Sequence, residues 1–197
     1  QADAKHGGAN LLQAAIWCHH HAILWQVLGS EELSFQNVFG HHALDVAVLS
    51  GNLEAARALL DTNEIGPEAL DLYSVHGATP LQFAARHGHA GLVELLLTRR
   101  ASVDLGTRGT HHDGRSALHL ASSKWQAECC RVLVEHRASV NLCDARGISP
   151  LELASLDRPM LVGCQEPHAR SRTLRVLLKQ TRLKTGGKKP HDLLVFV

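Results

Sequence analysis

The sequence predicts an all-α fold, a solenoid in which antiparallel helix pairs stack side by side and are joined by extended finger loops. A repeat is the first observation: the position of Pro80 recurs at Asn10, Ala43, Ala117 and Pro150, at spacings of 33, 37, 37 and 33 residues. Composition is the second: aromatic residues make up only 4% of the chain, so the core must be built from Leu, Ala and Val. Third, neither helix of a unit can bury its apolar face alone, so each unit needs neighbours on both sides.

The third unit shows why each helix should form. Thr79 is a good N-cap, and Pro80 suits the first turn of a helix, where a missing N–H costs nothing. Gly88 can take the left-handed conformation that ends this short helix. The second helix then carries a wide apolar stripe, made of Leu92, Val93, Leu96 and Leu97.

Five such units are expected, near residues 9–38, 39–75, 76–112, 113–145 and 146–185, with the first and last degenerate. An insertion at 157–168 interrupts the fifth unit between its two helices. Residues 1–8 form a segment before the solenoid, and residues 186–197 form a tail after it.

Three motifs carry a resemblance to a known family. They read TPLQFA at Thr79–Ala84, SALHLA at Ser116–Ala121 and SPLELA at Ser149–Ala154. This pattern resembles the ankyrin repeat, whose signature includes T-P-L-H-x-A. The resemblance implies an ankyrin-repeat solenoid used for non-catalytic recognition of other proteins, without a small-molecule substrate or a cofactor. It also implies that His119 is structural and that His89 tethers the turn between its helices by hydrogen bonds.

Charge and cysteine content exclude several classes. The formal net charge is +1, so bulk electrostatics do not favour binding of nucleic acid by the molecule as a whole. No apolar run approaches the roughly 18 residues that a membrane span needs, although peripheral membrane contact stays open. Five cysteines without paired spacing favour a reducing intracellular compartment. The cytoplasm is the default, and an organelle remains open because the sequence begins at Gln1 and a removed targeting peptide is compatible with that.

The chain holds 15 histidines, and the densest run is CHHH at Cys18–His21. On a helix, Cys18 and His21 would share a face, so two metal ligands are conceivable. An exposed turn between two helices is the favoured reading, because no second ligand pair follows nearby. The doublets at 41–42 and 111–112 fall in finger loops, and no phosphate loop or nucleophile motif occurs. The sequence therefore predicts no enzyme, no catalytic residue and no bound metal, with a histidine metal site as the minority alternative.

The sequence says more about surfaces that could bind a partner protein than about catalytic or metal sites. By template, the concave face is made by the fingers and by outward positions of the first helices. Apolar residues there form a predicted exposed patch near the N-terminal end, which marks an interaction site unless residues 1–8 cover it; it comprises Ile16, Trp17, Val46 and Leu49. Further candidate contacts on the later units are Phe83, Arg86, His87, Leu120, Lys124 and Trp125. Trp125 stands where the template has glycine, which leaves the local turn geometry open.

The C-terminal end is basic and then apolar. The basic end consists of Arg172, Arg175, Lys179 and Arg182, and the tail ends in Leu193, Leu194, Val195, Phe196 and Val197. We expect the tail to dock on a partner or to add a strand to a partner's sheet. The predicted function is a protein-interaction scaffold, an accessory subunit of a larger multiprotein assembly that could be membrane-associated or organellar. Alternatives are a free signalling or ubiquitin-ligase-type adaptor, and contact with anionic lipid or nucleic acid through the basic end.

Overall fold

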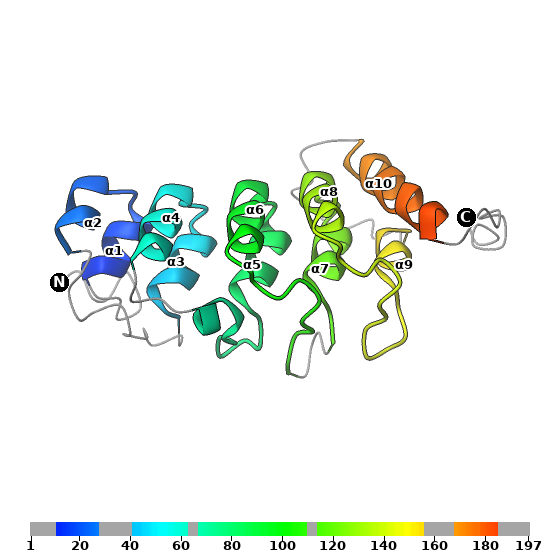
Figure 1. Ribbon diagram of the computed structural model, residues 1–197, viewed down its shortest axis with the longest axis horizontal. Coiled ribbons are helices and arrows are strands. Elements are labelled where there is room, and N and C mark those ends of the chain that lie inside the picture. The colour runs from blue at the N-terminus through cyan, green and yellow to red at the C-terminus, as the bar shows by residue number, and fades with distance from the viewer. Residues whose placement is uncertain (1–10, 28–40, 63–66, 110–113, 156–167, 185–197) are drawn as a thin grey trace.

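The computed structural model describes residues 11–27, 41–62, 67–109, 114–155 and 168–184, and in these ranges the chain forms a row of paired helices (Figure 1). The all-α solenoid is confirmed. The pairs are α1 (Leu11–Trp17) with α2 (His21–Val27), α3 (Ala43–Leu49) with α4 (Leu53–Asp61), α5 (Pro80–His87) with α6 (Ala90–Thr98), α7 (Ala117–Ser123) with α8 (Ala127–Glu135), and α9 (Pro150–Ser155) with α10 (Ala169–Lys184).

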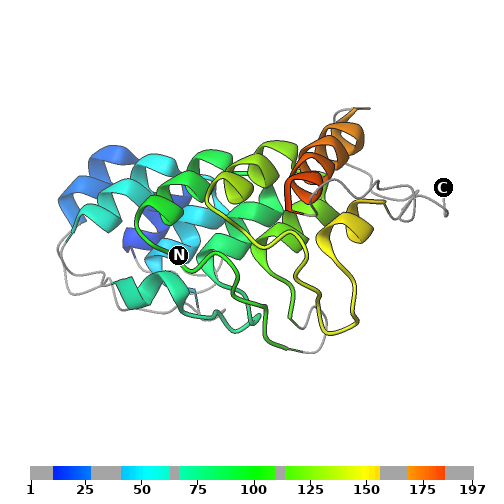
Figure 2. The same cartoon turned by 45° about the vertical axis from the view of Figure 1, so that its right-hand side comes forward.

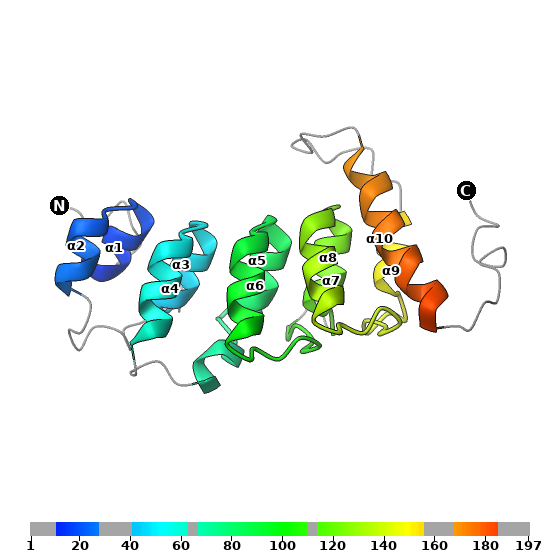
Figure 3. The ribbon, with the colours of Figure 1, turned by 45° about the horizontal axis from the view of Figure 1, so that its top comes forward.

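The first helices of successive pairs, α1, α3, α5, α7 and α9, contact one another in order and form an inner layer. The second helices α4, α6, α8 and α10 form an outer layer, and the fingers project from the opposite side (Figure 2). A short 3₁₀ helix, η2 (Pro67–Asp71), lies in the finger before α5. Figure 3 shows the pairs in one row, with α10 longer than the others and inclined to them.

Helix starts follow the sequence signals. The Thr79 side chain accepts a hydrogen bond from the amide of Gln82, and Gln82 in turn accepts from the amide of Thr79, with Pro80 in the first turn. Gly88 closes α5 in the left-handed region, at φ 82°. The expected cap and stop residues of this unit are confirmed.

Trp125 stands at the position where the repeat template has glycine, and the structure shows the turn geometry there. It occupies the glycine position of the turn and adopts the left-handed conformation itself, at φ 56°, as His19 does in the first pair. Its indole Nε1 donates to the carbonyl of Ala154 at 3.3 Å, on the next repeat. A non-glycine residue in this region costs about 1 kcal/mol or more, and the contact with the next repeat offsets part of that cost.

The first repeat is shifted by one residue from the predicted alignment. His19 has the backbone conformation of Gly51 and Gly88, and the amide after it bonds to Ala15 as the amide after Gly51 bonds to Ala47. The position of Pro80 therefore falls at Leu11, and the placement at Asn10 was wrong. This shift changes which side chains of α1 face inward.

The core is aliphatic and alanine-rich, as predicted. Cys129 and Cys130 are completely buried in it, and burial raises the pKa of each thiol to about 12. The interpretation of this pair as small core residues is confirmed.

The third residue has the same role in three of the first helices. Gln13 donates to the carbonyl of His41, Gln82 donates to the carbonyl of Arg115, and Nε2 of His119 bonds to the carbonyl of Ile148, so each links its repeat to the next finger. Asp45 occupies the same position in the second repeat and accepts from the amide of His42 instead. The structural role predicted for His119 is confirmed, and its burial lowers its pKa.

Candidate partner-binding groove

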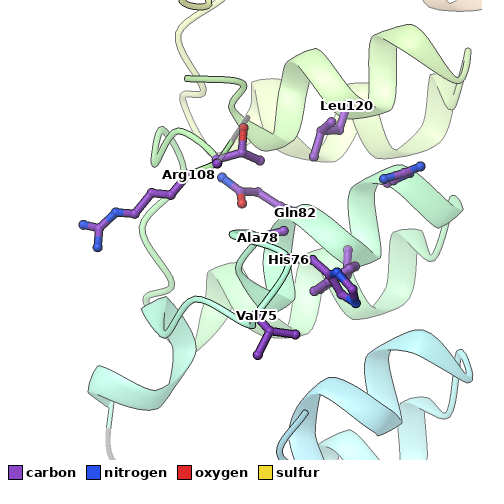
Figure 4. A pocket seen from close by; sticks show the side chains of 10 residues that line it. Val75, His76, Ala78, Gln82, Arg108 and Leu120 are labelled. Atoms are coloured by element: carbon purple, nitrogen blue, oxygen red, sulfur yellow. The ribbon is translucent and has the colours of Figure 1, made fainter. Parts of the chain in front are cut away.

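A hollow of about 610 Å³ opens to solvent between the inner helices α5 and α7 and the fingers that precede them (Figure 4). Its walls come from the finger before α5, one face of α5, the finger before α7, and α7. The lining residues are Val75, His76, Ala78, Gln82, Phe83, Arg86, Thr107, Arg108, Gly109 and Leu120. We call this hollow the groove.

The floor of the groove is apolar and packed. Phe83 and Leu120 occupy the same position on neighbouring helices, and each is almost buried. The ring of Phe83 also meets the ring of His41 edge-on, with centroids 6.1 Å apart. Burial is the main cause that lowers the pKa of His41, so this neighbour of Phe83 is uncharged at neutral pH. The floor therefore offers the edges of apolar side chains held by the core.

Hydrogen bonds hold the two fingers in place beside the groove. The amide of Arg108 donates to the carbonyl of Gly77 at 2.7 Å, and the Tyr73 hydroxyl donates to the carbonyl of Gly106 at 2.9 Å. A Cβ on Gly77 would lie 1.5 Å from the Arg108 carbonyl oxygen, so this close approach requires glycine. Gln82 adds a bond from its amide nitrogen to the carbonyl of Leu105 at 2.6 Å. The walls are thus fixed before any partner arrives.

The polar edge of the groove is positively charged. Arg86 and His87 lie in the last turn of α5, and Lys124 follows α7 directly. Burial lowers the pKa of His87, and the nearby charges of Arg86 and Lys124 lower it further. The guanidinium of Arg108 lies 4.1 Å from the centre of the Tyr73 ring and extends outward from the rim.

The structure brings together three of the predicted contact residues, Phe83, Arg86 and Leu120, as lining of the groove. Two others were predicted to be exposed, and that was wrong. Ile16 is 0% exposed, because the shifted alignment gives it the inward position of Val48 and Ala85. Val46 is 5% exposed, because it belongs to the hydrophobic core in which α3 packs against the neighbouring helices.

The other two members of the predicted apolar patch are exposed: Trp17 is 51% exposed and Leu49 is partly exposed. Trp25 on the outer helix was not predicted and is 63% exposed. The sequence alignment missed Trp25 because its template considered only the inner helices. The further exposed apolar residues of this first repeat are Leu11 and Ile23.

The remaining predicted residues lie away from the groove or outside the described ranges. Arg172, Arg175 and Lys179 are exposed on α10. The side chain of Arg182 and residues 193–197 lie outside what the structure describes, as do residues 1–8 and the insertion apart from residue 168. Predictions on those segments stay predictions.

Histidine clusters bring no metal site in the described ranges. No group of three His, Cys, Asp or Glu side chains there could hold a metal ion, and the doublet at 111–112 and the side chain of His21 lie outside them. His89 makes no capping hydrogen bond, so its predicted tethering role was wrong. Its ring packs against Gly51, where an added Cβ would approach it to 2.8 Å. Among the described helices, none is long and apolar enough to cross a membrane.

A buried ion pair escaped the sequence analysis. Arg115 donates from Nε to Asp144 Oδ2 at 3.1 Å, and both side chains are almost fully buried. Asp144 also accepts from the amides of Arg146 and Ile148, at 2.9 and 3.0 Å. The sequence does predict the turn that holds Asp144, because Asp144 lies three residues before Gly147, which takes φ 74°.

Comparisons with known proteins agree with this architecture. A family profile described as ankyrin repeats in three copies matches residues 11–107, and a single ankyrin-repeat profile matches residues 113–145. The chain is 34% identical over 126 residues to the B-cell lymphoma 3 protein homolog of Mus musculus, covering 64% of this chain and 27% of that protein.

Two further relatives span different kinds of protein. One is the transient receptor potential cation channel subfamily V member 5 of Homo sapiens, 31% identical over 140 residues, covering 66% of this chain and 19% of the channel. Another is the NF-kappa-B inhibitor alpha of Sus scrofa, 33% identical over 111 residues, covering 55% of this chain and 34% of the inhibitor. The chain thus spans about a fifth to a third of these relatives. Profile matches over more than half of its length, on helix pairs stacked as described, place the chain in the ankyrin repeat family.

Proposed function

We propose that this chain is a non-catalytic protein-binding module and that its groove receives a segment of a partner protein. The observation that carries the proposal is the groove itself, an open hollow of about 610 Å³ with an apolar floor and a polar rim. Concave sites of this kind are the usual places for ligands on proteins.

Rigidity supports the same proposal. The fingers on both sides are tied by the bonds of Arg108, Tyr73 and Gln82, so little freedom remains to be lost when a partner binds. An extended partner segment fits between two fingers, with its side chains directed toward Phe83 and Leu120. Apolar contact would supply the affinity, and the polar rim would supply the selectivity.

Two exposed side chains of one finger give a matched test. Val75 lines the groove and is 67% exposed, whereas Leu72 is 46% exposed and does not line it. The full chain, Val75→Asp and Leu72→Asp would be used to capture proteins from a native extract, with quantification by mass spectrometry. We expect a set of proteins to be retained by the wild type and Leu72→Asp and reduced at least fivefold by Val75→Asp. Equal capture by all three would overturn the proposal.

We further propose that the chain works as an accessory subunit of a larger assembly rather than as a free adaptor. Support comes from the first repeat, where Trp17 and Trp25 are more than half exposed, since large exposed apolar surface marks contact sites. The purified chain is then expected to self-associate, and Trp17→Lys with Trp25→Lys should reduce this. A wild type that stays monomeric by light scattering would favour the free adaptor.

The basic end is a second candidate, favoured by the exposure of Arg172, Arg175 and Lys179 along one face of α10. These residues follow one another at helical spacings of three and four, so their charges add up on one side. Binding to anionic vesicles or oligonucleotides should weaken steeply with salt and disappear when the three are changed to Gln. Salt-independent binding, or binding that survives the changes, would count against it.

A further inference from the structure

We propose that the groove selects partner segments in which an Asp or Glu side chain lies a few residues from a large apolar side chain. The inference rests on the proposed function and adds the chemistry of the partner. It begins from the charges that surround the groove.

Three cations beside the groove have no acidic partner among the described residues. Arg86, Arg108 and Lys124 make no ion pair there. In this they resemble exposed arginines elsewhere on the stack, such as Arg57, and differ from Arg99 and Arg131, which pair with Asp61 and with glutamates of the same helix. The positive charge at the groove is therefore available to a ligand.

The described residues that line the groove include no Asp or Glu. Among them, an acidic side chain meets only positive or neutral groups, whereas a basic one meets repulsion from Arg86 and from Lys124 close by. Charge interactions at an exposed site are screened over about 8 Å at physiological salt, so a ligand held at the end of α5 is affected most by the charges nearest to it. The groove thus discriminates between partners by the sign of their charge.

Spacing links the charge to the apolar floor. Phe83 and Arg86 are three residues apart on α5, so they share one face of the helix and both line the groove. Leu120 extends the floor onto α7, and Figure 4 shows it across the groove from Gln82. A segment that seats an apolar side chain on this floor holds its next residues beside the Arg86 guanidinium, which can bind a carboxylate in a bidentate pair.

The test is selection of random 12-residue peptides displayed on phage by the full wild-type chain. We expect the selected peptides to be enriched in Asp or Glu within four positions of Leu, Ile, Phe or Trp. Their affinities would then be measured by fluorescence polarisation. Arg86→Gln should weaken them about tenfold, because a charge-assisted contact at a partly exposed site is lost. Arg108→Gln should have a smaller effect of about threefold, because its guanidinium lies outward at the rim.

Reversal of the charge at Arg86 is a stricter test of the charge selection. Selection with Arg86→Glu should favour peptides that carry Lys or Arg in place of the acidic residue. The control is Arg57→Glu, the same change on exposed surface of the outer helix α4, and it should leave the selected sequences unchanged. Circular dichroism melting curves of the variants should coincide with the wild type, since the substituted arginines are exposed.

Outcomes separate this inference from the proposed function. One outcome would overturn the charge selection while leaving the groove as a binding site. In it, the selected peptides lose binding with Val75→Asp, but they show no preference for acidic residues and no response to Arg86→Gln. Peptides indifferent to Val75→Asp would overturn the proposed function itself. Stronger competition by a peptide of residues 191–197 than by any selected sequence would identify the chain's own tail as the occupant and overturn a partner segment.

Discussion

Replacement of Asp144 by Asn tests whether the buried ion pair stabilises the contact between the finger before α7 and the finger before α9. The carboxylate of Asp144 accepts from Arg115 Nε at 3.1 Å and from two amides of its own finger. Asn keeps the shape and one acceptor oxygen, so the finger can still close. It removes the negative charge, however, and so breaks the ion pair with the Arg115 guanidinium, whose side chain is 7% exposed.

The magnitude follows from that burial. Removal of one partner from a buried pair costs about 3–5 kcal/mol, because the remaining charge stays desolvated and uncompensated. For a chain of this size, such a loss lowers the melting temperature by about 6–20 °C. Replacement of both residues, Arg115→Met with Asp144→Asn, should restore much of the loss, since no unpaired charge remains and Asn keeps the acceptor for the two finger amides.

Titration of Asp144 gives a second readout with a defined sign. Burial alone would raise its pKa, but the amide of Ile148, the Arg115 guanidinium and the amide of Arg146 outweigh burial and hold the pKa below its usual value. A depressed pKa contributes stability that is complete above the unfolded pKa of about 4 and is lost as pH falls through the folded value. Asp144→Asn should abolish this acid-dependent part of the unfolding free energy.

Thermal melts followed by circular dichroism, together with hydrogen exchange of the finger amides, would measure both effects. Glu128→Gln is the matched control, because it removes the charge from an exposed pair with Arg131 and should leave the melting temperature unchanged. A melting temperature of Asp144→Asn within 2 °C of the wild type would refute the reasoning.

Three further predictions concern single residues. His119→Leu removes the ring's bonds to Ser116 and to the carbonyl of Ile148 and leaves the buried amide of Ser116 without its side-chain acceptor, so it should cost about 1–3 kcal/mol by urea unfolding. His119→Gln should cost less, because Gln serves at the same position of the third repeat. Because burial lowers the pKa of His119, its contribution should be complete above about pH 6.5 and decline below it, and a flat profile in wild type between pH 5 and 7 would contradict this. Arg137 is exposed at φ 67°, so Arg137→Gly should stabilise the chain by about 0.5 kcal/mol, and destabilisation would show that its side chain matters more than its backbone. Alkylation at pH 8 followed by mass spectrometry should modify exposed Cys143 at once and buried Cys129 and Cys130 only after unfolding, and equal rates would contradict their burial.

Repeat periodicity made the helix pairs, their caps and the aliphatic core predictable. Thr79, Pro80 and Gly88 carry local signals whose physics does not depend on the rest of the molecule. The positions of Phe83, Arg86 and Leu120 on the groove followed from the same alignment, because equivalent residues of a solenoid repeat face the same way.

Features that depend on a neighbouring repeat were harder to predict from the sequence. The glycine signal is missing in the first repeat, where His19 takes the left-handed conformation, so the alignment of α1 slipped by one residue and turned Ile16 outward. The pair of Arg115 with Asp144 joins two fingers that are 29 residues apart, a distance at which charge pairing leaves no periodic pattern. Val46 looked exposed because its cover comes from another repeat.

Asp45 has a consequence for the order in which the repeats unfold. Its carboxylate cannot donate a hydrogen bond, so the seam between the second and third repeats lacks the buried link to the following finger that Gln13, Gln82 and His119 provide elsewhere. Unfolding of stacked repeats starts where neighbours are coupled least. The N-terminal two repeats should therefore melt as a separate block, while the remainder, which carries α5 and α7 on either side of the groove, stays folded.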